Sequence, residues 1–467
     1  MGTGLARVTI SAPHRRVDVA LPEQTPLAEL LPEVLRHAGD GLADDGEQHG
    51  GWVLRRTDGV VLSTAQALLT QGVRDGEVLH LVPARAQWPE LEYDDVVEAI
   101  ADGARRRGGA WSGPATRMAT LVGAGVLLAV GLVAVLAGGP GQRGGGLPAL
   151  AVAGMLAVAG ALASRAYGDA LAGATLAGYA LPYAFVGGAL LVGTGDPVGL
   201  PGPLRWIGAP ELLAGSVALL LVGVFALAAV ASRVRILVAG ATTGLLGAVA
   251  ALGGLVLPPA GAAAVLLCAL VLLVAAVPLL AIRLGRVPMP PIALPTTTSD
   301  IGSDGARELP DRARVFTAVA RSEEMLSGLL TAHAVLAVGA MAVLVTTGGT
   351  AGRLLVAVCA ATLLLRSRLF VALRHRVPLL VAGLGGVVLL GAVLAGGTGP
   401  TGRLVLIGAA LLTALLTTAA GATYAHRPAS PYLARAADLT ETALVVSVVP
   451  VACAVLGLYA RARGLLG

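Results

Sequence analysis

From residue 117 onward the sequence consists mainly of apolar runs, and their length limits what the chain can fold into. Eleven runs can be separated, at 117–138, 147–163, 170–193, 211–231, 235–256, 260–282, 325–347, 351–365, 377–396, 402–424 and 441–460. Most of them approach the about 20 residues that an α-helix needs to cross about 30 Å of hydrocarbon. Only 13% of all residues are charged, against roughly 25% in soluble domains. The pattern predicts an all-α polytopic membrane domain of about eleven transmembrane helices.

Few residues in these runs could perform chemistry inside the membrane. Pumps and ion-coupled transporters usually carry ionisable side chains near the bilayer midplane. Here the acidic residues lie at the ends of runs, and only His333 lies within one. We interpret His333 as a hydrogen-bonding partner of a neighbouring helix, with a functional role as the alternative. An intramembrane transferase would need clustered His, Asp, Glu or Cys side chains at one membrane face, and no such cluster is apparent.

No metal, cofactor or catalytic site is predicted. The three cysteines, Cys268, Cys359 and Cys453, lie far apart in apolar runs and lack the spacing of a metal site or a disulfide framework. The histidines near the N-terminus occur singly. We therefore expect a protein that is not an enzyme.

The arginines indicate which ends of the runs face the cytoplasm. If the N-terminus is inside, nineteen arginines from residue 105 onward fall on the inner side and six on the outer side. Because cytoplasmic loops carry an excess of positive charge, this distribution predicts a cytoplasmic N-terminus. An odd number of crossings then places the C-terminus outside.

A more polar segment precedes the apolar runs. Residues 7–12 and 16–21 alternate apolar and polar side chains, which is typical of two paired strands joined by a tight turn. Thr25 as N-cap and Pro26 at the first position predict a helix that ends at Gly39. Three further strands, at 52–54, 60–62 and 77–82, and a short helical connection at 63–72 complete the pattern.

The order of these elements resembles the ubiquitin-like β-grasp fold, so we expect an α+β domain at 1–84. The segment has no free Gly-Gly end and no lysine, so conjugation is not expected. Residues 1–90 contain 8 arginines and 12 acidic residues, which argues against binding nucleic acid, whose phosphates favour a basic face. The simplest interpretation of the domain is a docking module.

The linker that follows, residues 85–116, is a candidate contact site for partner proteins. Residues 88–100 are expected to form an amphipathic helix that includes Asp94 and Asp95. The segment ends in Arg105, Arg106 and Arg107, directly before the first run. Three arginines at this position are typical of an anchor that fixes membrane topology.

The loop at 283–322 within the membrane domain (117–467) is a second candidate, and the predicted topology places it in the cytoplasm. It contains four prolines within eight residues, Pro288, Pro290, Pro291 and Pro295. Prolines at this density favour an extended, pre-ordered chain. The loop is therefore either a stiff connection or a surface that binds a partner protein.

Together these features resemble the EccD family of actinobacterial type VII (ESX) secretion systems. The resemblance covers nearly the whole chain. Its most telling parts are the segment YDDVVEAIADGARRR before the first run and the segment RVPMPPIALPT after the sixth. The chain contains neither lysine nor asparagine, which indicates a GC-rich bacterial genome and fits this group.

The resemblance implies a non-catalytic scaffold in the bacterial plasma membrane, without a cofactor. EccD-like proteins form a homodimer within a larger complex that also contains an FtsK/SpoIIIE-type ATPase (EccC) and the components EccB and EccE. Their ubiquitin-like domains contact cytoplasmic parts of that complex, including the ATPase, and their helices contact membrane lipid. The alternative function is a secondary transporter or permease with a regulatory cytoplasmic domain.

Overall fold

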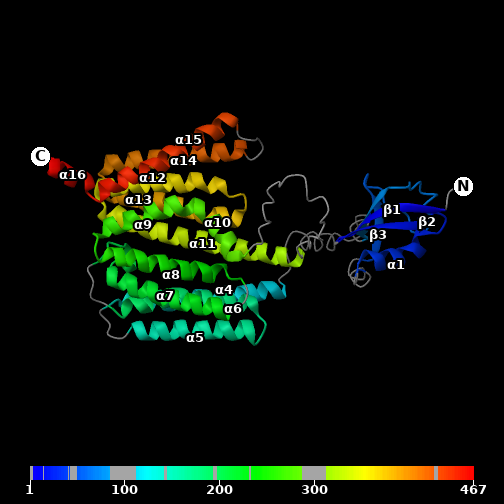
Figure 1. Ribbon diagram of the computed structural model, residues 1–467, viewed down its shortest axis with the longest axis horizontal. Coiled ribbons are helices and arrows are strands. Elements are labelled where there is room, and N and C mark those ends of the chain that lie inside the picture. The colour runs from blue at the N-terminus through cyan, green and yellow to red at the C-terminus, as the bar shows by residue number, and fades with distance from the viewer. Residues whose placement is uncertain are drawn as a thin grey trace, which may run out of the picture. The chain divides into compact units, whose positions relative to one another are not determined.

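The computed structural model describes residues 4–13, 15–39, 42, 50–84, 112–140, 145–192, 197–230, 233–286, 312–424 and 430–466. The chain separates into two compact units, Met1–Ser112 and Gly113–Gly467. Figure 1 shows the first as a small mixed unit of strands and helix, and the second as a bundle of long helices.

The described residues of the first unit form a four-stranded sheet packed against helix α1. Its elements are β1 (Leu5–Ser11), β2 (Arg16–Pro22), α1 (Leu27–Ala38), β3 (Trp52–Arg56) and β4 (Val78–Pro83). The strand order is β2-β1-β4-β3, in which β1 and β4 are parallel and the two outer pairs antiparallel. Ile10, Leu54 and Leu79 of the sheet are buried against Leu27 and Val34 of α1. The predicted α+β class is confirmed.

Three local predictions for this unit are wrong. The helix begins at Leu27, with Pro26 in the N-cap position and no capping bond from Thr25. Residues 63–72 form turns rather than a helix, and residues 60–62 make only one isolated bridge to β3. The errors at the start of α1 and at 63–72 share a cause, because the first amides of α1 bond to the carbonyls of Gln66 and Thr64. A segment outside the helix thus satisfies the amides that a side chain was expected to cap.

The second unit contains eleven helices that are long and apolar enough to cross a membrane, within the described part of the chain. They are α4 (Gly113–Gly138), α5 (Gly146–Arg165), α6 (Ala170–Leu190), α7 (Ala209–Ala229), α8 (Arg235–Gly254), α9 continued by α10 (Pro259–Leu273 and Val277–Gly285), α11 (Arg312–Thr347), α12 (Gly349–Arg366), α13 (Leu373–Gly397), α14 (Pro400–Tyr424) and α15 (Pro431–Val455). The short helix α16 (Leu458–Leu466) follows α15. The predicted architecture is confirmed.

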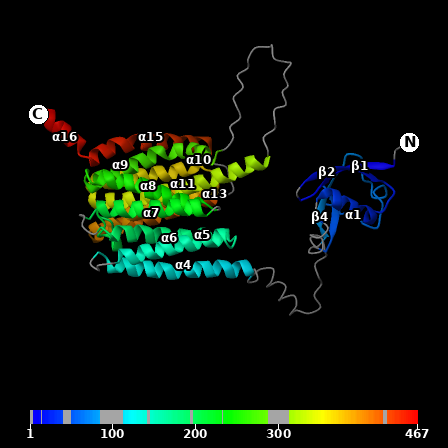
Figure 2. The same cartoon turned by 60° about the horizontal axis from the view of Figure 1, so that its bottom comes forward.

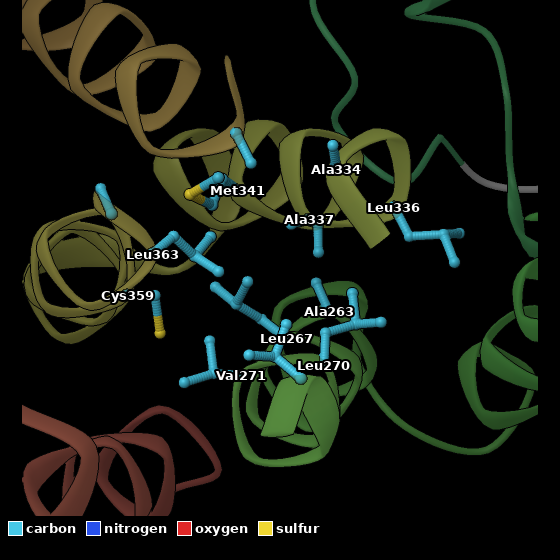
Figure 3. Close-up of a cluster of buried hydrophobic side chains, with 14 of the residues drawn as sticks. Ala263, Leu267, Leu270, Val271, Ala334, Leu336, Ala337, Met341, Cys359 and Leu363 are labelled. Atoms are coloured by element: carbon cyan, nitrogen blue, oxygen red, sulfur yellow. The ribbon is translucent and has the colours of Figure 1, made fainter. Parts of the chain in front are cut away.

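Helix α11 is the central helix of this bundle. It contacts α8, α9, α10, α12 and α13, and 78% of its apolar window is buried. The corresponding windows of α4 and α14 are 0% buried, so these two helices lie at the surface of the unit. Figure 3 shows the packed centre, where Leu267 and Val271 of α9 meet Met341 of α11 and Cys359 and Leu363 of α12.

Small residues allow some of these helices to approach closely. A Cβ atom on Gly160 of α5 would lie 2.8 Å from the carbonyl oxygen of Gly173 on α6. One on Gly146 would lie 2.9 Å from the carbonyl oxygen of Gly187. Lipid supplies no hydrophobic driving force between helices, so close backbone packing of this kind holds them together.

Candidate functional site

Charged side chains gather at one end of the helix bundle, which we call the arginine-rich end. It is the end at which α8, α11 and α13 begin and α7, α10 and α12 finish. Here Arg117 of α4 pairs with Asp169 before α6, and Arg374 of α13 pairs with Glu323 of α11. Each pair joins two helices that are not consecutive in the chain, so the charges help to hold the bundle together at this end.

Asp169 caps α6 and is held in its ionised form. Its Oδ1 atom accepts a hydrogen bond from the amide of Ala172 at 2.9 Å. This bond, together with the guanidinium of Arg117, lowers the pKa of the carboxyl group below its ordinary value, although partial desolvation acts in the opposite direction. A negative charge at a helix N-terminus also interacts favourably with the helix dipole.

A second group of charges lies deeper, between α12 and α15. The side chain of Arg366 is only 10% exposed, and its Nε atom lies 3.4 Å from Oε1 of Glu441, whose side chain is 16% exposed. This approach pairs the two charges without a hydrogen bond at Nε. The Nη1 group of Arg366 donates to the carbonyl of Val271. Arg368 lies 3.6 Å from Oε2 of Glu441 and 2.9 Å from Oδ1 of Asp438.

The carbonyl that Arg366 binds lies beside a break between α9 and α10. The helix tightens to 3-10 geometry at Val274–Ala276, directly before Pro278, which has no amide hydrogen to donate. On α9, one turn before this segment, the Leu270 carbonyl accepts a hydrogen bond from Nε2 of His333 at 2.8 Å. His333 and Arg366 therefore bind two consecutive carbonyls beside the break and fix α9 against α11 and α12.

The interpretation of His333 is confirmed, since this residue is 6% exposed and bonds to a neighbouring helix.

Arg366 and Glu441, which we call the buried pair, were not predicted from the sequence, because both residues stand at the ends of predicted runs. The structure places Glu441 ten residues inside α15, which begins at Pro431. Ser430 as N-cap and Pro431 at the first position were the signal for this earlier start.

The candidate contact residues lie outside the described part of the chain. They are Asp94, Asp95, Arg105, Arg106, Arg107, Pro288, Pro290, Pro291 and Pro295. Their roles therefore stay predictions, as do the amphipathic helix of the linker and the domain limits at 84 and 116.

The described residues contain no group of three or more His, Cys, Asp or Glu side chains that could hold a metal ion. Cys268, Cys359 and Cys453 are free thiols, each on a different helix. The described residues form paired charges and packed helices rather than a reaction centre.

Comparison with known protein families gives two matches that together cover most of the chain. Residues 116–465 match the family model described as the EccD-like transmembrane domain. The chain belongs to the EccD family. Residues 5–81 match the model of YukD, a protein of the WXG100 protein secretion system (Wss), which accords with the ubiquitin-like fold of the first unit.

Similar proteins and structures agree with this assignment. ESX-4 secretion system protein eccD4 from Mycobacterium tuberculosis, in strains CDC 1551 / Oshkosh and H37Rv, is 30% identical over 99% of this chain and 98% of its own length. Protomer 1 of the ESX-3 core complex has a TM-score of 0.58 and 24% identity, and covers 98% of this chain and 99% of that one. A chain of the MycP5-free ESX-5 inner membrane complex, State II, has a TM-score of 0.53 and 21% identity. The match covers 91% of this chain and 100% of that one. At these identities the two structures show a shared fold.

Membership of the EccD family shows what kind of protein this is. It is a non-catalytic, multi-pass membrane component of a type VII (ESX) secretion system, with a ubiquitin-like domain before its transmembrane helices. The arginine-rich end and the buried pair are accordingly interpreted as parts of a scaffold.

Proposed function

We propose that this EccD protein is the scaffold subunit of an ESX core membrane complex, and that its ubiquitin-like domain docks the secretion ATPase. The observation that carries the proposal is the match to eccD4 over 99% of the chain, which includes both the small domain and the bundle. The first unit supports a docking role, because it has its own core of buried residues, between Ala6 and Leu81. Such a domain can present a rigid surface to a partner.

The partners in this proposal are an FtsK/SpoIIIE-type ATPase of the EccC kind, the components EccB and EccE, and a second copy of this chain. Helices α4 and α14 support the presence of partners within the membrane, because their apolar windows are 0% buried inside the chain. Their surfaces are available to another subunit, to the second copy or to lipid.

The proposed complex can be tested by affinity purification of the full-length protein from its native cells in a mild detergent. We expect an FtsK-type ATPase and at least two further membrane proteins to co-purify at a constant ratio. Recovery of the protein alone in several mild detergents would contradict a scaffold role. It would favour the transporter or permease, for which reconstituted flux and its loss on replacement of His333 would be measured next.

The proposed topology places the arginine-rich end and the N-terminus in the cytoplasm and the C-terminus outside. Alkaline phosphatase fused after residue 467 should then be active, because it folds only outside the cytoplasm. The same enzyme fused after residue 424, one helix earlier, should be inactive, and this fusion serves as the matched control. An active fusion after residue 424 and an inactive one after residue 467 would show that the topology is the reverse of the proposed one. Equal activity of the two fusions would contradict the proposal that α15 crosses the membrane.

A further inference from the structure

The arginine-rich end has two sides that differ in how their arginines are neutralised. On the side of α12, α13 and α15, three arginines contact carboxylates: Arg366, Arg368 and Arg374. On the side of α10 and α11, the side chains of Arg283, Arg286 and Arg321 contact no carboxylate in the described part of the chain. Among the described residues, Arg283, Arg286 and Arg321 therefore lack the carboxylate pairing that is seen on the first side.

A groove lies among these arginines, between the end of α10 and the start of α11. Its volume is about 310 Å³, at the lower end of the roughly 300–1,000 Å³ of ligand pockets. Arg314, Thr317, Ala318 and Arg321 line it from α11, and their spacing places them on one face of that helix. Arg286 lines it from the end of α10. Three arginines, a threonine and small residues thus line the groove.

The groove is closed at one end by a close approach of the two helices. A Cβ atom on Gly285 would lie 2.6 Å from Cβ of Ser322, so only glycine allows this contact. Arg286, the next residue, adopts a left-handed backbone conformation with φ of 52° and ends α10 there. The two helices are thus held together at the edge of the groove that is lined by Arg286 and Arg321.

The groove lies near the start of α11, a helix that is longer than one membrane crossing requires. Helix α11 has 36 residues, or about 54 Å at 1.5 Å per residue, which exceeds the about 30 Å of hydrocarbon. Figures 1 and 2 show it running past its neighbours at the arginine-rich end. Leu280 and Leu284 of α10 lie within five residues of the lining residue Gly285 and are 46% and 49% exposed. Phe316 of α11 precedes the lining residue Thr317 and is 71% exposed. Apolar surface that suits acyl chains therefore adjoins a basic hollow that suits phosphate.

We propose that this groove binds the phosphate headgroup of an anionic phospholipid, held by Arg286, Arg314 and Arg321. Guanidinium groups form charge-assisted, often bidentate hydrogen bonds with phosphate oxygens. A general excess of arginine at the cytoplasmic side explains the charge, but it does not require three arginines to line one groove. The adjoining leucines favour a lipid over free phosphate, since only a lipid contacts both surfaces.

The test measures the binding of fluorescent phosphatidylglycerol to the full-length protein in detergent. The double variant Arg286→Gln/Arg321→Gln should bind about tenfold more weakly or worse, as expected for the loss of charge-assisted hydrogen bonds. The matched control is Arg376→Gln/Arg435→Gln, which removes two exposed arginines of the same end that do not line the groove. It should bind as the natural sequence does, within about twofold.

A second variant, Ala318→Leu, fills the groove without changing its charge and should weaken binding by a similar factor. This variant keeps the proposal testable if the double variant fails to fold. Equal losses in both double variants would show a diffuse surface charge and overturn the proposal. If phosphatidylcholine binds as tightly as phosphatidylglycerol, the groove does not select an anionic headgroup and the proposal is overturned. Full competition by inorganic phosphate would identify a general anion site instead. Full competition by polyglutamate would identify a protein-docking site.

Discussion

Replacement of Glu441 by alanine is expected to destabilise the protein by about 3–5 kcal/mol. The reason is that Arg366, whose side chain is only 10% exposed in the natural protein, would lose the carboxylate that pairs with it, and an unpaired buried charge costs this much. Arg368 would keep its contact with Asp438, so the loss falls mainly on Arg366. The free energy of unfolding would be measured by denaturant titration of the full-length protein in detergent.

Asp438→Ala is the matched control for this experiment. Asp438 lies less than one turn from Glu441 on the same helix and pairs with Arg368, but its side chain is 72% exposed. Exposed ion pairs contribute about 0–1 kcal/mol, so this variant should unfold almost as the natural sequence does. Equal destabilisation by the two replacements would contradict the importance of burial at Glu441.

A double variant separates the charge from the packing. Arg366→Leu/Glu441→Leu removes both charges, and it should recover part of the stability lost in Glu441→Ala. Recovery should remain incomplete, because the carbonyl of Val271 would lose the donor that Arg366 provides beside the α9–α10 break. Full recovery would show that this hydrogen bond contributes little.

Hydropathy predicts the presence of a membrane-spanning helix better than the residues at which it begins and ends. A run of about 20 apolar residues has few alternatives to a membrane-spanning helix, because lipid satisfies no backbone polar group. The ends of the helices were predicted less well. Residues 431–440 contain polar side chains, yet α15 continues through them, because backbone hydrogen bonds do not depend on hydropathy.

The same limit explains why the buried pair was missed. Arg366 and Glu441 are far apart in the sequence, and their contact depends on how α12 and α15 pack together. His333 was easier to interpret, because a single polar group inside an apolar run needs a hydrogen-bond partner wherever the helices lie. In the first unit, the strands at 7–12 and 16–21 were predicted from their alternation, whereas the start of α1 depended on a tertiary contact with residues 64–66.

Removal of residues 1–84 is expected to release the ATPase while the other membrane subunits remain bound. The first unit and the bundle each have a hydrophobic core of their own, so removal of the first unit leaves the core of the bundle complete. If the domain supplies the main contact, co-purified ATPase should fall about tenfold or more, since each 1.4 kcal/mol of lost binding is tenfold. The measurement is the ratio of ATPase to the tagged protein after purification in mild detergent.

A point substitution makes the same test without shortening the chain. Leu54 is 0% exposed in the core of the first unit, and Leu54→Asp should unfold that unit by burying an unpaired charge. Val60, which is 54% exposed, provides the control Val60→Asp, which introduces the same charge at the surface. Loss of the ATPase from the truncated chain and from Leu54→Asp, but not from Val60→Asp, would support docking by the folded domain. If the ATPase stays bound to the truncated chain, docking by this domain is wrong, and the contact would be sought in the linker and the proline-rich loop.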